Sequence, residues 1–453
     1  MRKGVSAMTK NGILWAIATA AALLGAVACG DDDAGGGDGG ADTDTDSDAD
    51  SDADGGADGG DTDIECTDAD MYWIWDLSSM PPTDTQVCAH IRGEGANVHV
   101  LVADAAWGST VDQAKVDALI AAWDDATPAD PSHGIYSIVT GAFGDPPDVF
   151  DGDPKIWLFL YEMAGFEGYT FDGYFKVDDE LDGATSNHHE MLHINSLNNA
   201  PDGDYSLSVQ AHEFQHLIHW GADSGETAWV NESMSELAMV LTGFGADEAW
   251  VTSWLNDPSA ALMAGGPDYD YGVLLLFGDY LYERFGGEFV RALVADTGHG
   301  VAPIEAMLGA RDTPTTFADL LGDLALAIAA NDPDLGDGRY GFELIDIQAP
   351  DAASLSSSEQ AAVTPAANGG FAFVTSSEGV DDTTLRIETD SPDAVVVRAA
   401  FEGDAGGSMV EVALTGTTTD VALGAWPAGA ELDIAVANPT GAAVPVTFTM
   451  INE

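Results

Sequence analysis

Two kinds of hydrophobic periodicity follow each other along the chain after residue 64. Up to about residue 200, short apolar runs predict strands at 98–103, 135–140 and 156–161, and a longer amphipathic run predicts a helix at 111–124. Between residues 205 and about 345, apolar positions recur at helical spacing and predict helices that include 271–285, 287–295 and 317–330. Strands followed by helices predict an α+β fold with a strand-rich N-terminal lobe and a helical C-terminal lobe.

From about residue 351 the pattern changes to short β-rich runs separated by Gly, Pro, Asp and Asn. These runs lie at 371–375, 384–389, 394–400, 410–415, 431–438 and 444–451. Their regular spacing predicts a β-sandwich. This part contains no constellation of His, Cys or paired acids that points to chemistry. We therefore expect an accessory domain at 351–453, for binding or for stability, after a main domain at 64–350.

Residues 1–29 have the pattern of an export signal. Basic residues precede an apolar stretch at 13–27 that is too short and too rich in Ala for a membrane span. The small residues before Cys29 resemble a bacterial lipobox, which implies cleavage at this point and a lipid anchor on Cys29. The alternative is an ordinary secretory signal cleaved near Ala28. Either interpretation predicts an exported protein, as a cell-envelope lipoprotein or in the extracellular space.

Residues 30–63 consist almost entirely of Asp, Gly, Ala, Thr and Ser, so we expect a disordered tether. Its alternating aspartates can attract Ca²⁺, but they lack the Gly and Glu placement of an EF-hand loop, and a solvated linker is the favoured interpretation. The formal net charge of −65 extends far beyond this segment. Such acidity disfavours nucleic acid and anionic membrane surfaces as partners.

The chain has three cysteines. With Cys29 assigned to the lipid, Cys66 and Cys88 remain as a pair. In an oxidising compartment such a pair predicts one disulfide at the start of the folded region.

A candidate metal site lies in the motif from His212 to His216. The surrounding run predicts a helix that Ser206 caps, with an apolar face made of Leu207, Ala211, Phe214 and Ile218. On that helix His212 and His216 lie one turn apart, where both can bind one Zn²⁺ ion, and Glu213 can approach a water at the metal as general base.

Such a site needs a third ligand, and a second predicted helix offers Glu232 and Glu236 on one face, beside a buried stripe of Val230, Met234, Leu237 and Leu241. One glutamate should bind the metal and the other should orient His212. We favour Glu232 as the ligand, and the choice between the two stays open. Three protein ligands leave a fourth position for water, as in catalytic zinc sites. A metzincin pattern is excluded, because His219 and Ala222 occupy the positions where Gly and His are required.

A second HExxH motif runs from His189 to His193. Alternating residues and the breaker at 198–203 predict a short strand here rather than a helix. Residues four apart on a strand are separated by roughly 13 Å, too far to share one metal ion. We therefore assign zinc to the later motif.

A developing oxyanion requires a hydrogen-bond donor, and Tyr271 or Tyr269 at the head of an apolar helix can supply it. Aromatic packing at a helix start is the alternative for Tyr271. We expect His219 and His299 to be core or surface histidines.

These segments are similar to the hyicolysin family of secreted bacterial zinc metallopeptidases. The similarity rests on the His212 motif with Trp229, Val230, Asn231 and Glu232, and extends over roughly residues 95 to 300. It includes the segments 143–147, 155–161, 173–175 and 186–192, and continues to Tyr271 and Tyr280. The resemblance implies a gluzincin-like domain in which Glu232 binds zinc and Glu236 supports a ligating histidine.

The sequence thus predicts an exported, lipid-anchored zinc endopeptidase that hydrolyses extracellular proteins or peptides, with Glu213 as general base. The alternative is a surface binding protein or adhesin that keeps a zinc-stabilised peptidase fold without turnover. Glu213 favours the enzyme, because a binding protein has no need of a general base. Aminopeptidase activity is less favoured, because no upstream acidic motif anchors a free amine.

Overall fold

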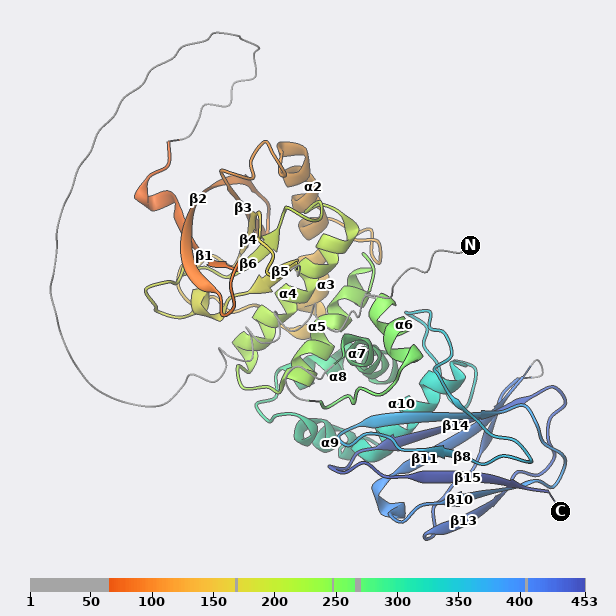
Figure 1. The fold of residues 1–453 in the computed structure, drawn as a ribbon. Helices are drawn as coiled ribbons and strands as arrows, with labels where there is room; N and C mark the ends of the chain where they lie inside the picture. The colour runs from red at the N-terminus through yellow and green to blue at the C-terminus, as the bar shows by residue number, and fades with distance from the viewer. Residues whose placement is uncertain (1–64, 168–169, 247, 265–269, 404–405, 453) are drawn as a thin grey trace, which may run out of the picture.

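The computed structural model describes residues 65–452 apart from 168–169, 247, 265–269 and 404–405. The predicted export segment with Cys29 and the predicted tether lie outside these residues. The described chain is a mixed α+β structure with three parts: a sheet with flanking helices, a group of helices and two further sheets (Figure 1). None of its helices is long and apolar enough to cross a membrane.

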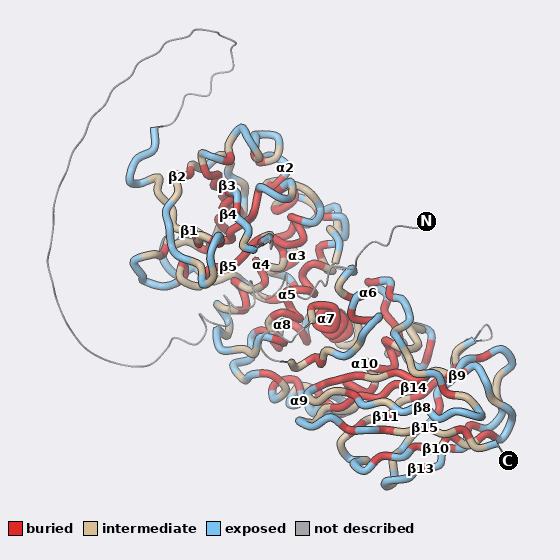
Figure 2. The backbone as a smooth tube through the Cα atoms, in the orientation of Figure 1, coloured by how far each residue is buried: buried red, intermediate tan, exposed pale blue. Residues whose placement is uncertain are grey.

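The first part is a six-stranded sheet with the strand order β1-β2-β3-β4-β6-β5. Neighbouring strands β3, β4 and β6 are parallel, and the other pairs are antiparallel. The three parallel strands are buried at every position, which fits their continuous apolar sequences (Figure 2). The strands are β1 (Met71–Asp76), β2 (Thr83–Glu94), β3 (Val98–Ala103), β4 (Ile156–Tyr161), β5 (Gly173–Phe175) and β6 (Met191–Asn195).

The predicted disulfide is confirmed: Cys66 and Cys88 are bonded, with their Cα atoms 6.1 Å apart. Cys88 lies on β2, opposite Met71 of β1. The bond therefore fastens the start of the described chain to the first hairpin.

Two helices lie between β3 and β4, namely α2 (Gln113–Asp124) and α3 (Ile135–Phe143). The α2 helix starts two residues after the predicted position because Asp112 caps it by accepting the N–H of Lys115. The strand predicted at 135–140 is wrong, because this run forms most of α3. Its buried positions, Ile135, Val139, Ala142 and Phe143, have helical spacing, and a six-residue window is too short to reveal it.

The helical part follows β6. Its helices are α4 (Asp204–Ala222), α5 (Ala228–Thr242), α6 (Glu248–Asn256), α7 (Tyr271–Phe285), α8 (Gly287–Val294), α9 (Val301–Gly309) and α10 (Phe317–Ala330). The predicted bounds of α7 and α10 are confirmed, and α8 ends one residue before its predicted end. Short 3₁₀ turns are η1 (Asp68–Asp70), η2 (Val177–Glu180) and η4 (Pro392–Ala394).

Helices α5 and α7 approach each other closely at Gly278. A Cβ atom at this position would meet the carbonyl oxygen of Ser233 far inside van der Waals distance. The contact matters for the site described below, because Ser233 follows Glu232 on α5.

We expect Gly278→Ala to lower the free energy of unfolding by about 1–3 kcal/mol, since the added methyl must push two packed helices apart. Urea unfolding measures this change. The matched control is Gly141→Ala on α3, where an added Cβ meets nothing within 4 Å. Equal stability of the Gly278 and Gly141 variants would contradict the close approach.

The C-terminal part consists of two sheets with strand orders β13-β10-β15-β8 and β12-β11-β14-β9-β7. They pack face to face, because apolar residues of both sheets share one core. The strands are β7 (Ala353–Ser354), β8 (Ala361–Val363), β9 (Gly370–Ser376), β10 (Thr384–Glu388), β11 (Val396–Glu402), β12 (Ser408–Val410), β13 (Thr418–Ala422), β14 (Glu431–Asn438) and β15 (Val446–Ile451).

The strand predicted at 410–415 is mostly wrong. Only Val410 belongs to β12, and residues 411–415 join no sheet ladder. Val412 and Leu414 nevertheless pack against the core of the two sheets. The alternating pattern therefore identified which side chains face the core, and it could not reveal whether the backbone pairs with a neighbour.

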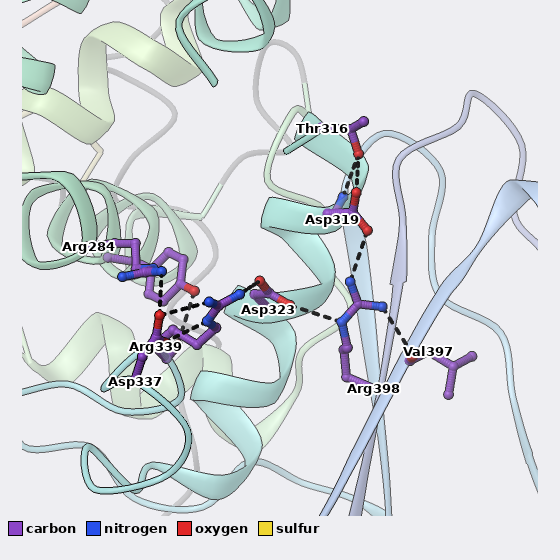
Figure 3. A network of polar contacts seen from close by, with 9 residues as sticks. Arg284, Thr316, Asp319, Asp323, Asp337, Arg339, Val397 and Arg398 are labelled. Atoms are coloured by element: carbon purple, nitrogen blue, oxygen red, sulfur yellow. Dashed lines mark hydrogen bonds and ion pairs between the residues drawn. The ribbon is translucent and has the colours of Figure 1, made fainter. Parts of the chain in front are cut away.

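The outer face of the five-stranded sheet packs on α10. Phe371, Phe373 and Ala435 of this sheet belong to the same core as the helices, so the main core continues past residue 350. Arg398 of β11 donates to Asp323 at 2.9 Å and to Asp319 at 3.0 Å on α10 (Figure 3). Apolar packing and these charged bonds together hold the two-sheet part against the helices.

Candidate metal centre

Helix α4 carries His212 and His216 into the interior of the protein. It begins at Asp204, with Gly203 before it, so the predicted cap at Ser206 is wrong. Ser206 is buried in the first turn, where its Oγ accepts a hydrogen bond from Gln210. The helix is longer than predicted because the turn at 200–203 ends directly before Asp204. His212 and His216 lie near its middle, where helical geometry is firmly held.

His212, His216 and Glu232 come together between α4 and α5. The two Nε2 atoms of the histidines are 3.0 Å apart, and Glu232 Oε2 lies 3.5 Å from each of them. Tetrahedral ligands with metal–ligand bonds of about 2.0–2.1 Å are about 3.3–3.4 Å apart. The three atoms therefore form a triangle of the size that a tetrahedral Zn²⁺ site requires.

The outer nitrogens of both histidines have acceptors. His212 Nδ1 lies 3.2 Å from Glu236 Oε1, and His216 Nδ1 lies 2.6 Å from Asn231 Oδ1 and 3.0 Å from Ser235 Oγ. A carboxylate and an amide oxygen can only accept, so each Nδ1–H donates. This tautomer leaves the Nε2 lone pairs pointing toward Glu232, as metal-ligating histidines require.

His212, His216 and Glu232 form a triad in which the charge of each residue depends on the charges of the other two. Burial disfavours the charged form of all three groups, but the attraction between the histidines and Glu232, with Glu236 also acting on His212, outweighs it. It raises the pKa of His212 and His216 and lowers the pKa of Glu232. Glu232 Oε2 is itself buried and has no hydrogen-bond partner. A buried carboxylate oxygen that lacks a donor is stabilised by positive charge, and a divalent cation between the three atoms would supply it. The donor set of two imidazoles and one carboxylate suits Zn²⁺.

Glu213 follows His212 on α4 and points toward the edge strand β5. Its Oε2 accepts the N–H of Phe175 at 2.9 Å, which fixes the carboxylate beside the triad. Burial raises the pKa of Glu213, although the two histidines oppose this shift. A carboxyl group of this kind can both accept and return a proton.

Tyr271 is the first residue of α7, and its buried ring lies 6.3 Å from the ring of His212, centroid to centroid. The structure thus brings Tyr271 to the site, while Tyr269 lies outside the described residues. His219 is fully buried and His299 pairs with Asp223 at 3.4 Å. Neither belongs to the triad, in agreement with their expected roles in the core and at the surface.

The second HExxH motif does not form a comparable site. As predicted, it runs into a strand, β6, on which His193 lies. His193 Nε2 is 2.8 Å from Asp179, whereas His189 Nδ1 is 2.7 Å from Asp151, so the two rings have separate partners. The extended backbone explains why they do not converge.

The sequence did not reveal which groups orient His216 and Glu213. These groups are Asn231 and Ser235 for His216, and the backbone N–H of Phe175 for Glu213. Asn231 and Ser235 are one turn apart on α5, directly beside Glu232 and Glu236. The sequence did offer one signal for these roles. Asn231 with Ser235 and Glu232 with Glu236 are two adjacent polar pairs at one-turn spacing on a helix that is otherwise buried. The sequence carries no signal for the contact between Phe175 and Glu213, because nearly every residue type supplies a backbone N–H.

Compared with known proteins, the chain matches no protein-family model and no curated protein.

Proposed function

We propose that the protein is an exported zinc endopeptidase with a gluzincin-like domain related to the hyicolysin family. The convergence of His212 Nε2, His216 Nε2 and Glu232 Oε2 carries the proposal, together with outer hydrogen bonds that leave both Nε2 atoms free to ligate. Proteins or peptides outside the cell are the proposed substrates. We also propose that a lipid on Cys29 anchors the protein to a membrane.

His212, His216 and Glu232 would hold the ion. When bound, Zn²⁺ supplies a Lewis acid for the scissile carbonyl and makes water more acidic at neutral pH. Glu213 takes the proton from the attacking water at its carboxylate and returns it to the leaving amine. The N–H of Phe175 keeps that carboxylate in position through both transfers. Tyr271, next to His212, is the proposed donor to the developing oxyanion.

Glu232→Gln and Glu236→Gln should differ in zinc affinity. Glu232→Gln removes a ligand charge, so we expect most of the zinc to be lost. Glu236→Gln weakens only the support of His212 and should cost about 10–100-fold in affinity. Competition with a chromogenic zinc chelator measures both values. If the Glu236 variant loses the metal while the Glu232 variant keeps it, the third ligand lies one helical turn further along α5.

The reaction itself can be tested on an unfolded protein substrate. Zinc-loaded protein should generate internal fragments that mass spectrometry detects, and removal of zinc should stop their formation. Release of N-terminal residues alone would contradict an endopeptidase. No cleavage of any protein or peptide by the zinc-loaded chain would leave the surface binding protein as the better account.

A further inference from the structure

Apart from the metal centre, a group of three carboxylates lies beside strands β4 and β6 of the six-stranded sheet. Asp148 and Asp151 belong to the loop between α3 and β4, and Glu190 directly precedes β6. One carboxylate oxygen from each lies within 4.8 Å of the others. The group therefore joins two segments that are about forty residues apart in the sequence.

Glu190 is buried and only partly satisfied. It is 1% exposed, its Oε1 accepts the N–H of Val149 at 2.7 Å, and its Oε2 has no hydrogen-bond partner. Glu180 of η2 is 2% exposed and has no partner for either oxygen. Burial, and then the negative charge of Glu190, raises the pKa of Glu180 to about 9. A carboxyl group with its pKa raised in this way stays neutral at neutral pH, so Glu180 itself needs no ion. The unpartnered Glu190 Oε2 belongs to the same cluster as Asp148 and Asp151, where a cation would stabilise it.

Positive charge from the protein is scarce at this group. His189 pairs with Asp151 at 2.7 Å. Within the described ranges, Lys155 pairs with Glu94 and Lys176 with Asp84, so neither lysine pairs with this group. The local excess of negative charge is therefore left for an external cation.

We propose that Asp148, Asp151 and Glu190 bind one Ca²⁺ ion, independently of the zinc centre. Three carboxylates are hard oxygen ligands, and two of them stand on a loop that can adjust to the irregular coordination of Ca²⁺, with water completing the shell. The ion ties the 148–153 loop to β6. Binding modules outside the cell hold Ca²⁺ with dissociation constants of about 10⁻⁴–10⁻³ M, and we expect a value in that range.

Thermal unfolding of the zinc-loaded full chain tests the site. In Ca²⁺-free buffer with zinc present, addition of 10 mM Ca²⁺, roughly ten times the upper expected dissociation constant, should raise the Tm by ~2–4 °C. Glu190→Gln should abolish the rise. Its Tm without Ca²⁺ should equal or exceed that of the parent, because the amide still accepts the N–H of Val149 and a buried charge is gone.

Glu359→Gln makes the same chemical change at an exposed position and should keep the full rise. A parent Tm that ignores Ca²⁺, an equal rise in the Glu190 variant, or an equal rise with Mg²⁺ would overturn the proposal. Asp148→Asn, at an exposed position, provides a second variant that should fold and lose the Ca²⁺ response.

Luminescence of bound Tb³⁺ gives a direct readout. The ring of Trp157 stacks on His189 at 4.0 Å between centroids, and His189 contacts Asp151, so Trp157 should sensitise the ion. The tether lacks aromatic residues and should contribute no such signal. Trp157→Phe should lose the luminescence and keep the Ca²⁺-dependent Tm rise. Unchanged luminescence in Asp148→Asn would place Tb³⁺ elsewhere and overturn the assignment.

Discussion

His216→Ala is expected to remove both bound zinc and peptide hydrolysis. His216 is one of the three proposed protein ligands, and Asn231 and Ser235 hold its ring in place, so the variant keeps only His212 and Glu232 of that group. Zinc content, measured by elemental analysis of the purified protein, should fall from one ion per chain to near zero.

The matched control is His189→Ala, which removes the first histidine of the other HExxH motif. It should leave zinc content near one ion per chain, because His189 contacts Asp151 and lies on a different part of the fold. If the His189 variant loses zinc while the His216 variant retains it, with both folded, the metal has been assigned to the wrong motif.

Glu213→Gln is expected to keep zinc and lower the rate of peptide hydrolysis by at least ~10²-fold. General acid–base catalysis contributes ~10²–10⁴-fold, and the amide cannot accept the proton of water. The fold should not change, because the amide oxygen can still accept the N–H of Phe175. Turnover on a fluorogenic peptide, zinc content and Tm should be measured on one preparation of each protein.

A Glu213→Gln variant with the turnover of its parent would show that this carboxylate is not the general base. The peptidase mechanism in its proposed form would then be untenable, whatever metal the site holds. Loss of zinc in this variant would instead mean that Glu213 supports the metal centre structurally.

The sequence predicted the fold best where an element is long and its pattern is strong. The bounds of α7 and α10 are confirmed because fourteen or fifteen residues of apolar spacing admit only a helix. The run at 135–140 was assigned to the wrong class because six apolar residues fit a buried strand as well as one face of α3. Local pattern also could not reveal that α10 packs on the outer face of a sheet from the C-terminal part.

The site was predictable as far as its residues repeat with helical spacing. The helical spacing placed His212 and His216 on one helix face and Glu232 and Glu236 on another. Predicting the site then required only that these two helices pack against each other. The structure brings Glu232 to both Nε2 atoms and Glu236 to His212 Nδ1, and this geometry favours Glu232 over Glu236 as the third ligand. Contacts between distant segments, such as Glu213 with Phe175 or Glu190 with Val149, depend on strand order and loop path, which no local pattern encodes.

A zinc titration with simultaneous peptide hydrolysis tests the central claim most directly. Metal-free full-length protein receives increasing Zn²⁺, and bound zinc and the hydrolysis rate are measured at each step. We predict that the rate rises in proportion to bound zinc and stops rising at one tightly bound ion per chain. Saturation of a single tight site without any hydrolysis of proteins or peptides would contradict the enzyme and favour a zinc-stabilised binding protein.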